Sequence, residues 1–130
     1  MTDDRKGRVS QEQLEKELKR LSANFSEKLP ARLQALVEEW QALNGGDWSQ
    51  DAARALHRSV HGLVGTAGSL GFDGMAKTAR RLEHRLVALL EGTDAPTEKQ
   101  NLEVMEWFEK IGEAAAEDAQ DETSISSMKI

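Results

Sequence analysis

The stretch that decides the fold is QDAARALHRSVHGLVGTAGSL, residues 50–70. Its apolar side chains recur at intervals of three and four residues, the spacing that gathers them on one face of an α-helix. These side chains are Leu56, Val60, Leu63, Ala67 and Leu70. Ser49 precedes the stretch, where a serine oxygen can cap a first helical turn, and Gly71 ends it. The stretch therefore predicts an amphipathic helix with one face in a core.

Two further amphipathic segments follow downstream. The first covers residues 74–91, with Asp73 placed to cap it and Gly92 at its end. The second begins at Asp94 or Thr97. Their apolar stripes consist of Met75, Ala79, Leu82, Leu86 and Leu89 in the first, and of Leu102, Met105, Phe108, Ile111 and Ala115 in the second. Each stripe has helical spacing, so each segment predicts another helix of the same kind.

A longer apolar stripe lies upstream, between Ser10 and residue 43. Pro30 interrupts it, which predicts either two helices or one long helix with a kink. The ends of the chain, 1–9 and 120–130, have no apolar period, so we expect a disordered N-terminus and a tail or linker. The stripe consists of Leu14, Leu18, Leu21, Phe25, Leu29, Leu33, Leu36, Val37, Trp40 and Leu43.

Together these segments predict one all-α domain over residues 10–119, an antiparallel four-helix bundle with an N-terminal helical extension. Short connections between consecutive helices favour antiparallel neighbours. The predicted core consists of Leu33, Leu36, Trp40, Leu56, Val60, Leu63, Ala67, Leu82, Leu86, Met105 and Phe108.

The composition agrees with a small domain of this kind and excludes several classes of function. The 130 residues are 38% hydrophobic, and no apolar run approaches the roughly 18 residues that span a bilayer. Cysteine is absent, which excludes disulfides and thiolate chemistry. The net charge of −6, without a basic block, argues against nucleic acid as a partner. We therefore expect a cytoplasmic monomer that contacts neither membrane nor nucleic acid.

The face of the 50–70 helix opposite to the apolar stripe carries a histidine. On a wheel of about 100° per residue, His61 points away from the stripe, and His57, Gly65 and Gly68 lie within about 40° of it. Gly62 lies nearer to the core edge, where close helix packing would explain it. Each glycine inside a helix costs about 0.8–1 kcal/mol relative to alanine, so glycines that face solvent need a reason. We infer that bare backbone lets another protein approach the imidazole.

The segment HGLVGTAGSLGF, residues 61–72, resembles the phosphorylation motif of histidine phosphotransfer domains. Those motifs have a histidine, an apolar residue two positions on, a glycine four on, small residues next and often a glycine ten on. The pair Leu82-Glu83 resembles the family as well. The strong match covers residues 57–83, and the bundle pattern extends it to roughly 20–115. The resemblance implies that His61 exchanges a phosphoryl group with an aspartyl phosphate, a reaction that suits the nucleophilic nitrogen of neutral histidine.

The same resemblance implies a place in two-component signalling, as a phosphoprotein that relays phosphate through phosphohistidine. The implied partners are a response-regulator receiver domain, a hybrid histidine kinase, or both. We expect no kinase activity, because the chain has no Walker-type or glycine-rich nucleotide motif. We expect no cofactor, with magnesium supplied through the receiver. The candidate docking residues around the phosphoacceptor are His57, Arg58, Val64, Gly65, Gly68, Lys77 and Arg81.

One departure from the family pattern keeps other functions open. Where the family commonly has a lysine three residues after the histidine, this chain has Val64, so a cation that would neutralise the phosphoryl group is missing. A helical docking module that is not phosphorylated is therefore one alternative. A small metal-binding bundle is another, because His57 and His61 are spaced i, i+4, although no carboxylate shares their helix face. We interpret His84, which lies among arginines, as ordinary solvated surface.

Overall fold

The computed structural model is all-helical and describes the backbone of residues 2–46, 48–92 and 94–128. Side-chain burial is described for residues 10–46, 48–92 and 94–120. Within these ranges the chain forms four helices, α1 (Thr2–Asn44), α2 (Gln50–Ser69), α3 (Asp73–Glu91) and α4 (Glu98–Met128). None of the described helices combines the length and the hydropathy that a membrane-spanning segment requires.

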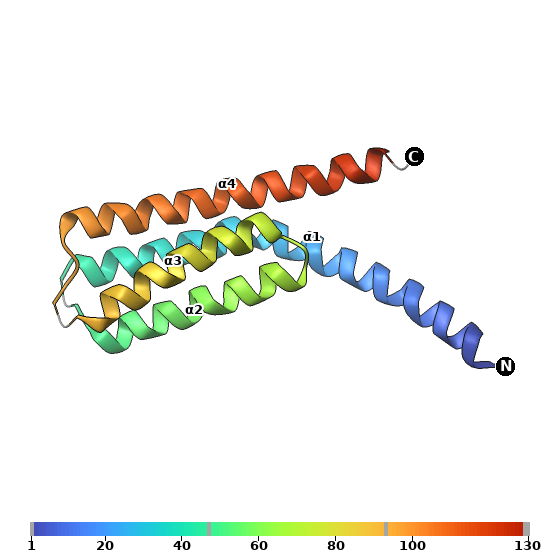
Figure 1. Cartoon of the computed structure of the whole chain (residues 1–130), viewed down its shortest axis with the longest axis horizontal. Helices are drawn as coiled ribbons and strands as arrows, with labels where there is room; N and C mark the ends of the chain where they lie inside the picture. The colour runs from blue at the N-terminus through green and yellow to red at the C-terminus, as the bar shows by residue number, and fades with distance from the viewer. Residues whose placement is uncertain (1, 47, 93, 129–130) are drawn as a thin grey trace.

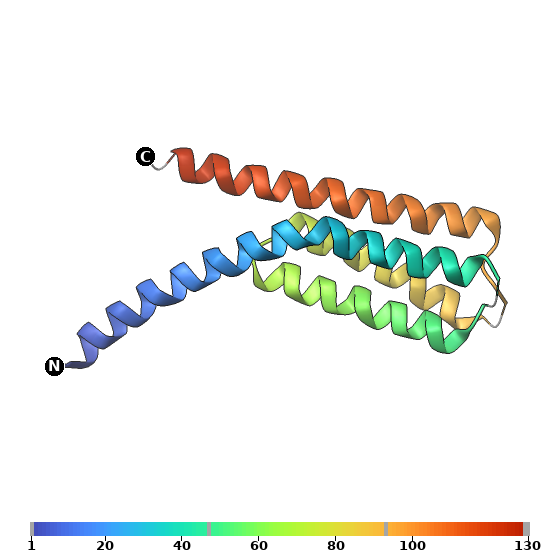
Figure 2. The same cartoon turned by 180° about the vertical axis from the view of Figure 1, so that it is seen from behind.

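The four helices pack as an antiparallel bundle, which confirms the predicted fold class (Figure 1). Helix α2 packs on α1 and α3, and α4 packs on α3 and α1, so the helices close into a ring around one core. The N-terminal part of α1 leaves the bundle and projects away from it (Figure 2). This projection corresponds to the N-terminal helical extension that the sequence predicted.

The core is built from the apolar stripes. Trp40, Val60, Leu63 and Leu82 are fully buried, with 0% exposure each. The predicted core residues are buried except Leu33 and Met105, which are partly buried and pack against the core. The buried residues are Leu29, Leu36, Trp40, Leu43, Ala53, Leu56, Val60, Leu63, Val64, Ala67, Phe72, Met75, Ala76, Ala79, Leu82, Leu86, Val104, Phe108, Ile111 and Ala115.

Two parts of the predicted stripes are exposed instead. Leu102 is 62% exposed, while Val104 takes the core position, because the buried face of α4 continues from Val104 to Phe108 and Ile111 at spacings of four and three. On the projecting part of α1 the stripe leucines are exposed, because the helix leaves the bundle there (Figure 1), and Leu21, nearest to the bundle, lines an open groove between α1 and α2. Their exposed fractions are 59% for Leu14, 42% for Leu18 and 43% for Leu21.

The outer helices are longer than the sequence patterns indicated. Helix α1 passes through Pro30 without a break, so the upstream stripe forms one helix and not two. Where the sequence predicted disorder over 1–9 and a tail over 120–130, the helices continue out to Thr2 and Met128. A missing apolar period removes the reason to pack, but a helix already begun can extend, because each added residue gains a hydrogen bond without a new nucleation step. Residues 1, 129 and 130 lie outside the described residues.

The helix starts follow local capping chemistry at two of three sites. The side chain of Ser49 accepts a hydrogen bond from the Ala52 amide, as the sequence predicted for α2. Before α4, Thr97 and Gln100 each accept a hydrogen bond from the backbone N–H of the other. This reciprocal pair is a capping box, and it places the start of α4 after Thr97 and not after Asp94.

The start of α3 is capped from another helix. Asp73, the cap expected from the sequence, is already the first helical residue, and Phe72 precedes it without a side-chain cap. Asp118 of α4 instead accepts from the amide of Gly74 at 3.3 Å and from that of Met75 at 2.8 Å. A Cβ at Gly74 would lie 2.8 Å from an Asp118 oxygen, so a side chain there would displace the carboxylate from this close approach. The contact ties α4 to the α2–α3 turn.

Candidate functional site

His61 stands on the outer face of α2, as the helical wheel predicted. Its side chain is 70% exposed, while its neighbours Val60 and Leu63 are completely buried. Val60 and Leu63, buried on either side of His61, fix the rotation of α2, so the packing of the core holds the imidazole toward solvent. The ring is therefore accessible without any pocket.

Glu83 of α3 reaches the His61 ring from the adjacent helix. Its Oε1 lies 2.8 Å from Nδ1 of His61, and its side chain is only 16% exposed. Leu82, next to it, is fully buried, which places Glu83 at the edge of the core facing α2. An ionised carboxylate can only accept hydrogen bonds, so this contact favours the His61 tautomer with the proton on Nδ1. In that tautomer the other ring nitrogen, Nε2, has a free lone pair and can act as a nucleophile.

A second imidazole lies near the same carboxylate. Nε2 of His57 lies 3.8 Å from Oε1 of Glu83, and the His57 side chain is 23% exposed. The rings of His57 and His61 are stacked, with centroids 6.4 Å apart and planes at 21°. The sequence identified no carboxylate beside these histidines on their own helix, and the fold supplies one from α3. Even so, among the described residues no group of three or more candidate ligands could hold a metal ion.

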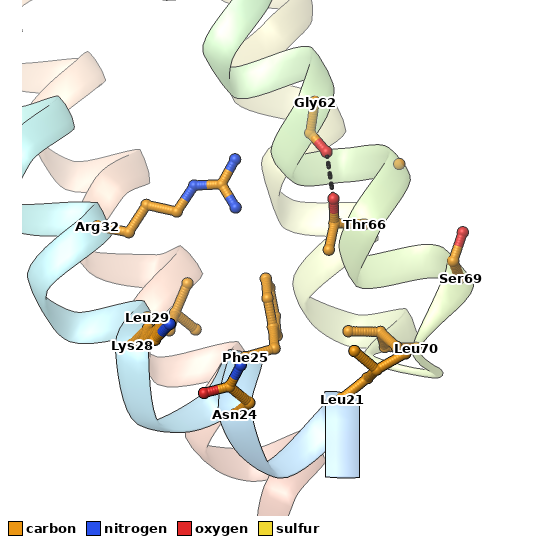
Figure 3. A pocket seen from close by; sticks show the side chains of 11 residues that line it. Leu21, Asn24, Phe25, Lys28, Leu29, Arg32, Gly62, Thr66, Ser69 and Leu70 are labelled. Atoms are coloured by element: carbon orange, nitrogen blue, oxygen red, sulfur yellow. Dashed lines mark hydrogen bonds between the residues drawn. The ribbon is translucent and has the colours of Figure 1, made fainter. Parts of the chain in front are cut away.

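The glycines of α2 leave bare backbone next to His61. A Cβ built on Gly62, Gly65 or Gly68 would meet nothing within 4 Å. The open space at Gly65 and Gly68 agrees with the sequence interpretation. For Gly62 the sequence indicated close helix packing, and that interpretation was wrong, because no neighbouring helix packs closely there. Thr66 donates its hydroxyl to the Gly62 carbonyl at 3.0 Å, which turns the polar atom inward to the helix (Figure 3).

An open apolar groove of about 680 Å³ runs between α1 and α2 along this glycine surface (Figure 3). We call it the α1–α2 groove. Its apolar wall includes Phe25 and Leu70, and Lys28 and Arg32 of α1 provide positive charge. In Figure 3 the Arg32 side chain extends from α1 toward α2. The lining residues are Leu21, Asn24, Phe25, Lys28, Leu29, Arg32, Gly62, Gly65, Thr66, Ser69 and Leu70.

The predicted docking residues do not form one continuous surface. Val64 is only 8% exposed and belongs to the core, so it cannot form part of a contact surface as predicted. Val64 lies three residues after His61 on α2, and the packing of α2 between α1 and α3 covers it. Arg58 is exposed on α2, and Gly65 and Gly68 are exposed beside His61. His84 is exposed, as expected for solvated surface.

Lys77 and Arg81 line a different groove, formed by α3 and α4. Trp107 of α4 lies in that groove, with the Arg81 guanidinium 6.0 Å and the Lys110 ammonium 4.6 Å from its ring centroid. The sequence grouped Lys77 and Arg81 with the docking residues because helix 74–91 is basic on its outer face. Lys77 and Arg81 therefore do not line the α1–α2 groove.

Sequence reasoning missed the contact between Glu83 and His61, and it missed the contribution of α1. A signal for Glu83 was present, because an antiparallel turn centred near Gly71 sets residue 61 at the level of about residue 82 on the next helix. No comparable signal identified Lys28 and Arg32, because no short turn sets which part of α1 lies beside His61 and α1 could pack on α2 at many positions along its axis.

One comparison with known proteins gives a match. The family model described as Hpt domain matches residues 20–121, which is most of the chain. Among curated proteins and among solved structures, none matches this chain at a significant level.

Proposed function

Because this chain belongs to the Hpt domain family, whose members are phosphocarrier modules of two-component phosphorelays, we propose that His61 is its phosphoacceptor. The observation that carries the proposal is the pairing of His61 with Glu83 on an exposed helix face. That pairing favours the tautomer in which Nε2 is unprotonated, on a side chain that is 70% exposed. The ring therefore offers its lone pair to an incoming phosphoryl group without first losing a proton.

The reaction that we propose is reversible transfer between His61 and an aspartyl phosphate of a receiver domain. The Nε2 lone pair forms the N–P bond, and the P–O bond to the aspartyl oxygen breaks, which leaves the aspartate as a carboxylate. Nδ1 keeps its proton, so the imidazole ring becomes positively charged as the bond forms. The Glu83 carboxylate, 2.8 Å from Nδ1, stabilises this charge.

The α1–α2 groove is the surface on which we expect the receiver to dock. It lies along the glycine backbone of α2, where a Cβ at Gly62 or Gly65 would meet nothing within 4 Å, so the backbone itself is open to a partner. Lys28 and Arg32 complement the acidic phosphorylation site of a receiver. They also provide the positive charge that the buried Val64 does not. The receiver supplies Mg²⁺, and a hybrid histidine kinase is the expected source of phosphate upstream.

In this proposal the chain is a carrier without kinase activity of its own, and we expect it to act as a cytoplasmic monomer. The test is to incubate it with a phosphorylated receiver domain and Mg²⁺, and to look for protein-bound phosphate that is labile in acid and stable in base. His61→Gln should abolish acceptance, because glutamine lacks the nucleophilic ring nitrogen. Its melting temperature should change little, since the side chain is 70% exposed.

His84→Gln, a substitution of an exposed histidine on α3, is the matched control and should accept phosphate normally. Uptake by His61→Gln would assign the phosphate to another residue. If the unaltered chain accepts no phosphate from any of several receivers, the alternative function, a docking module that is not phosphorylated, would replace this proposal.

A further inference from the structure

His57, next to the proposed phosphoacceptor, has a buried ring nitrogen, Nε2, without a hydrogen-bond partner. Oε1 of Glu83 lies 3.8 Å from this nitrogen. That distance is too long for a hydrogen bond but within the range of a charge interaction.

The protonation of His57 follows from this environment. A buried nitrogen that carries a lone pair toward a carboxylate would be repelled by it, whereas an N–H in the same place is attracted. The neutral ring therefore favours the tautomer that places the proton on Nε2, facing Glu83. Leaving that N–H unpaired is costly in a covered position, so a small closing movement that joins it to Oε1 lowers the free energy.

From this geometry we propose that His57 is a positioning residue for His61, whose Nε2–H holds the Glu83 carboxylate in place to accept the Nδ1–H of His61. The same oxygen then accepts from both rings, one from each of two successive turns of α2. With one donor Glu83 can turn away, and His61 can then exchange its proton between the two ring nitrogens. With two donors the carboxylate is fixed, and the reactive Nε2 stays free.

The stacking of the two rings supports this role. The centroids lie 6.4 Å apart with the planes within 21° of each other, and Nδ1 of His61 and Nε2 of His57 lie 2.8 Å and 3.8 Å from the same Glu83 oxygen. His57 is also more covered than His61, with 23% of its side chain exposed against 70%. The better covered ring is suited to hold the carboxylate, and the exposed ring is suited to react.

The inference rests on the proposed function of His61, but its first test does not need phosphorylation. In uniformly ¹⁵N-labelled, unphosphorylated protein, imidazole nitrogen shifts report which nitrogen of His61 carries the proton. We expect the Nδ1–H form in the unaltered chain, and a mixture of both forms in His57→Leu, which has no donor. His57→Gln places an amide N–H near the position of Nε2 and should restore the Nδ1–H form. His57→Ala is a second donor-free variant if the leucine does not fit.

The second readout is the rate of phosphoryl acceptance from phosphoramidate, a small donor that needs no docking surface. Loss of an ordinary hydrogen bond corresponds to about a fivefold change in rate, so we expect up to that slowing in His57→Leu. His57→Gln should recover most of the rate, and His84→Leu, on exposed α3 surface, should equal the unaltered chain.

An unchanged His61 tautomer in both donor-free variants would overturn the positioning role, whatever the rates. Equal slowing in His57→Leu and His57→Gln would also overturn it, because the donor would then not matter. If the tautomer changes as expected and His61 accepts no phosphate, the positioning role stands and the phosphotransfer function fails.

Discussion

Glu83→Gln removes one charge beside His61 and leaves the shape of the side chain nearly intact. The amide oxygen can still accept from Nδ1, so the hydrogen bond persists in a neutral form. Hydrogen bonds to charged groups contribute about 1.5–3 kcal/mol, and neutral ones about 0.5–1.5 kcal/mol, so the substitution loses roughly 1–1.5 kcal/mol. Because His61 is 70% exposed, water screens part of the charge, and the lower end of that range applies.

Only the part of the interaction that strengthens as the ring becomes positive affects the rate. During transfer the His61 ring gains positive charge, so its interaction with the Glu83 carboxylate strengthens in the transition state. A loss of about 1 kcal/mol corresponds to roughly fivefold slower phosphoryl acceptance.

The assay follows ³¹P NMR of the phosphohistidine during incubation with phosphoramidate. Glu91→Gln, which changes an exposed carboxylate at the end of the same helix, is the matched control and should react at the normal rate. If Glu83→Gln accepts phosphate as fast as the control, the carboxylate does not stabilise the transferring ring, and the proposed role of Glu83 is wrong.

Three other substitutions test the docking surface and the fold. Gly65→Gln should leave the melting temperature intact, because its Cβ meets open space, yet slow transfer from a receiver while acceptance from phosphoramidate stays normal; normal receiver transfer would refute the steric argument. Leu63→Ala should lower stability by about 2–5 kcal/mol in a thermal or denaturant melt, since Leu63 is 0% exposed. An unchanged midpoint would contradict the register of α2. Asp118→Ala should cost about 1–2 kcal/mol in the same melt by removing the cap of α3, and Asp73→Ala should cost less; the reverse order would show that α3 is capped locally.

The outward position of His61 could be predicted because it depends on one helix alone. Residues 50–70 carry their own apolar stripe, and the angle between that stripe and His61 is fixed by the geometry of an α-helix. The same reasoning correctly placed Gly65 and Gly68 on the exposed face. Val64, which the sequence grouped with the docking residues, is buried instead, because its coverage depends on how closely α1 and α3 approach.

The amino-acid sequence by itself thus determined the number of bundle helices, the buried face of α2 and the identity of the exposed histidine. All of these follow from spacings within one segment. Only the tertiary structure decided that Glu83 meets both His57 and His61, and that Lys28 and Arg32 line the α1–α2 groove. Contacts between helices depend on their relative level and rotation, which the packing of the whole core sets and which no single stretch of sequence encodes.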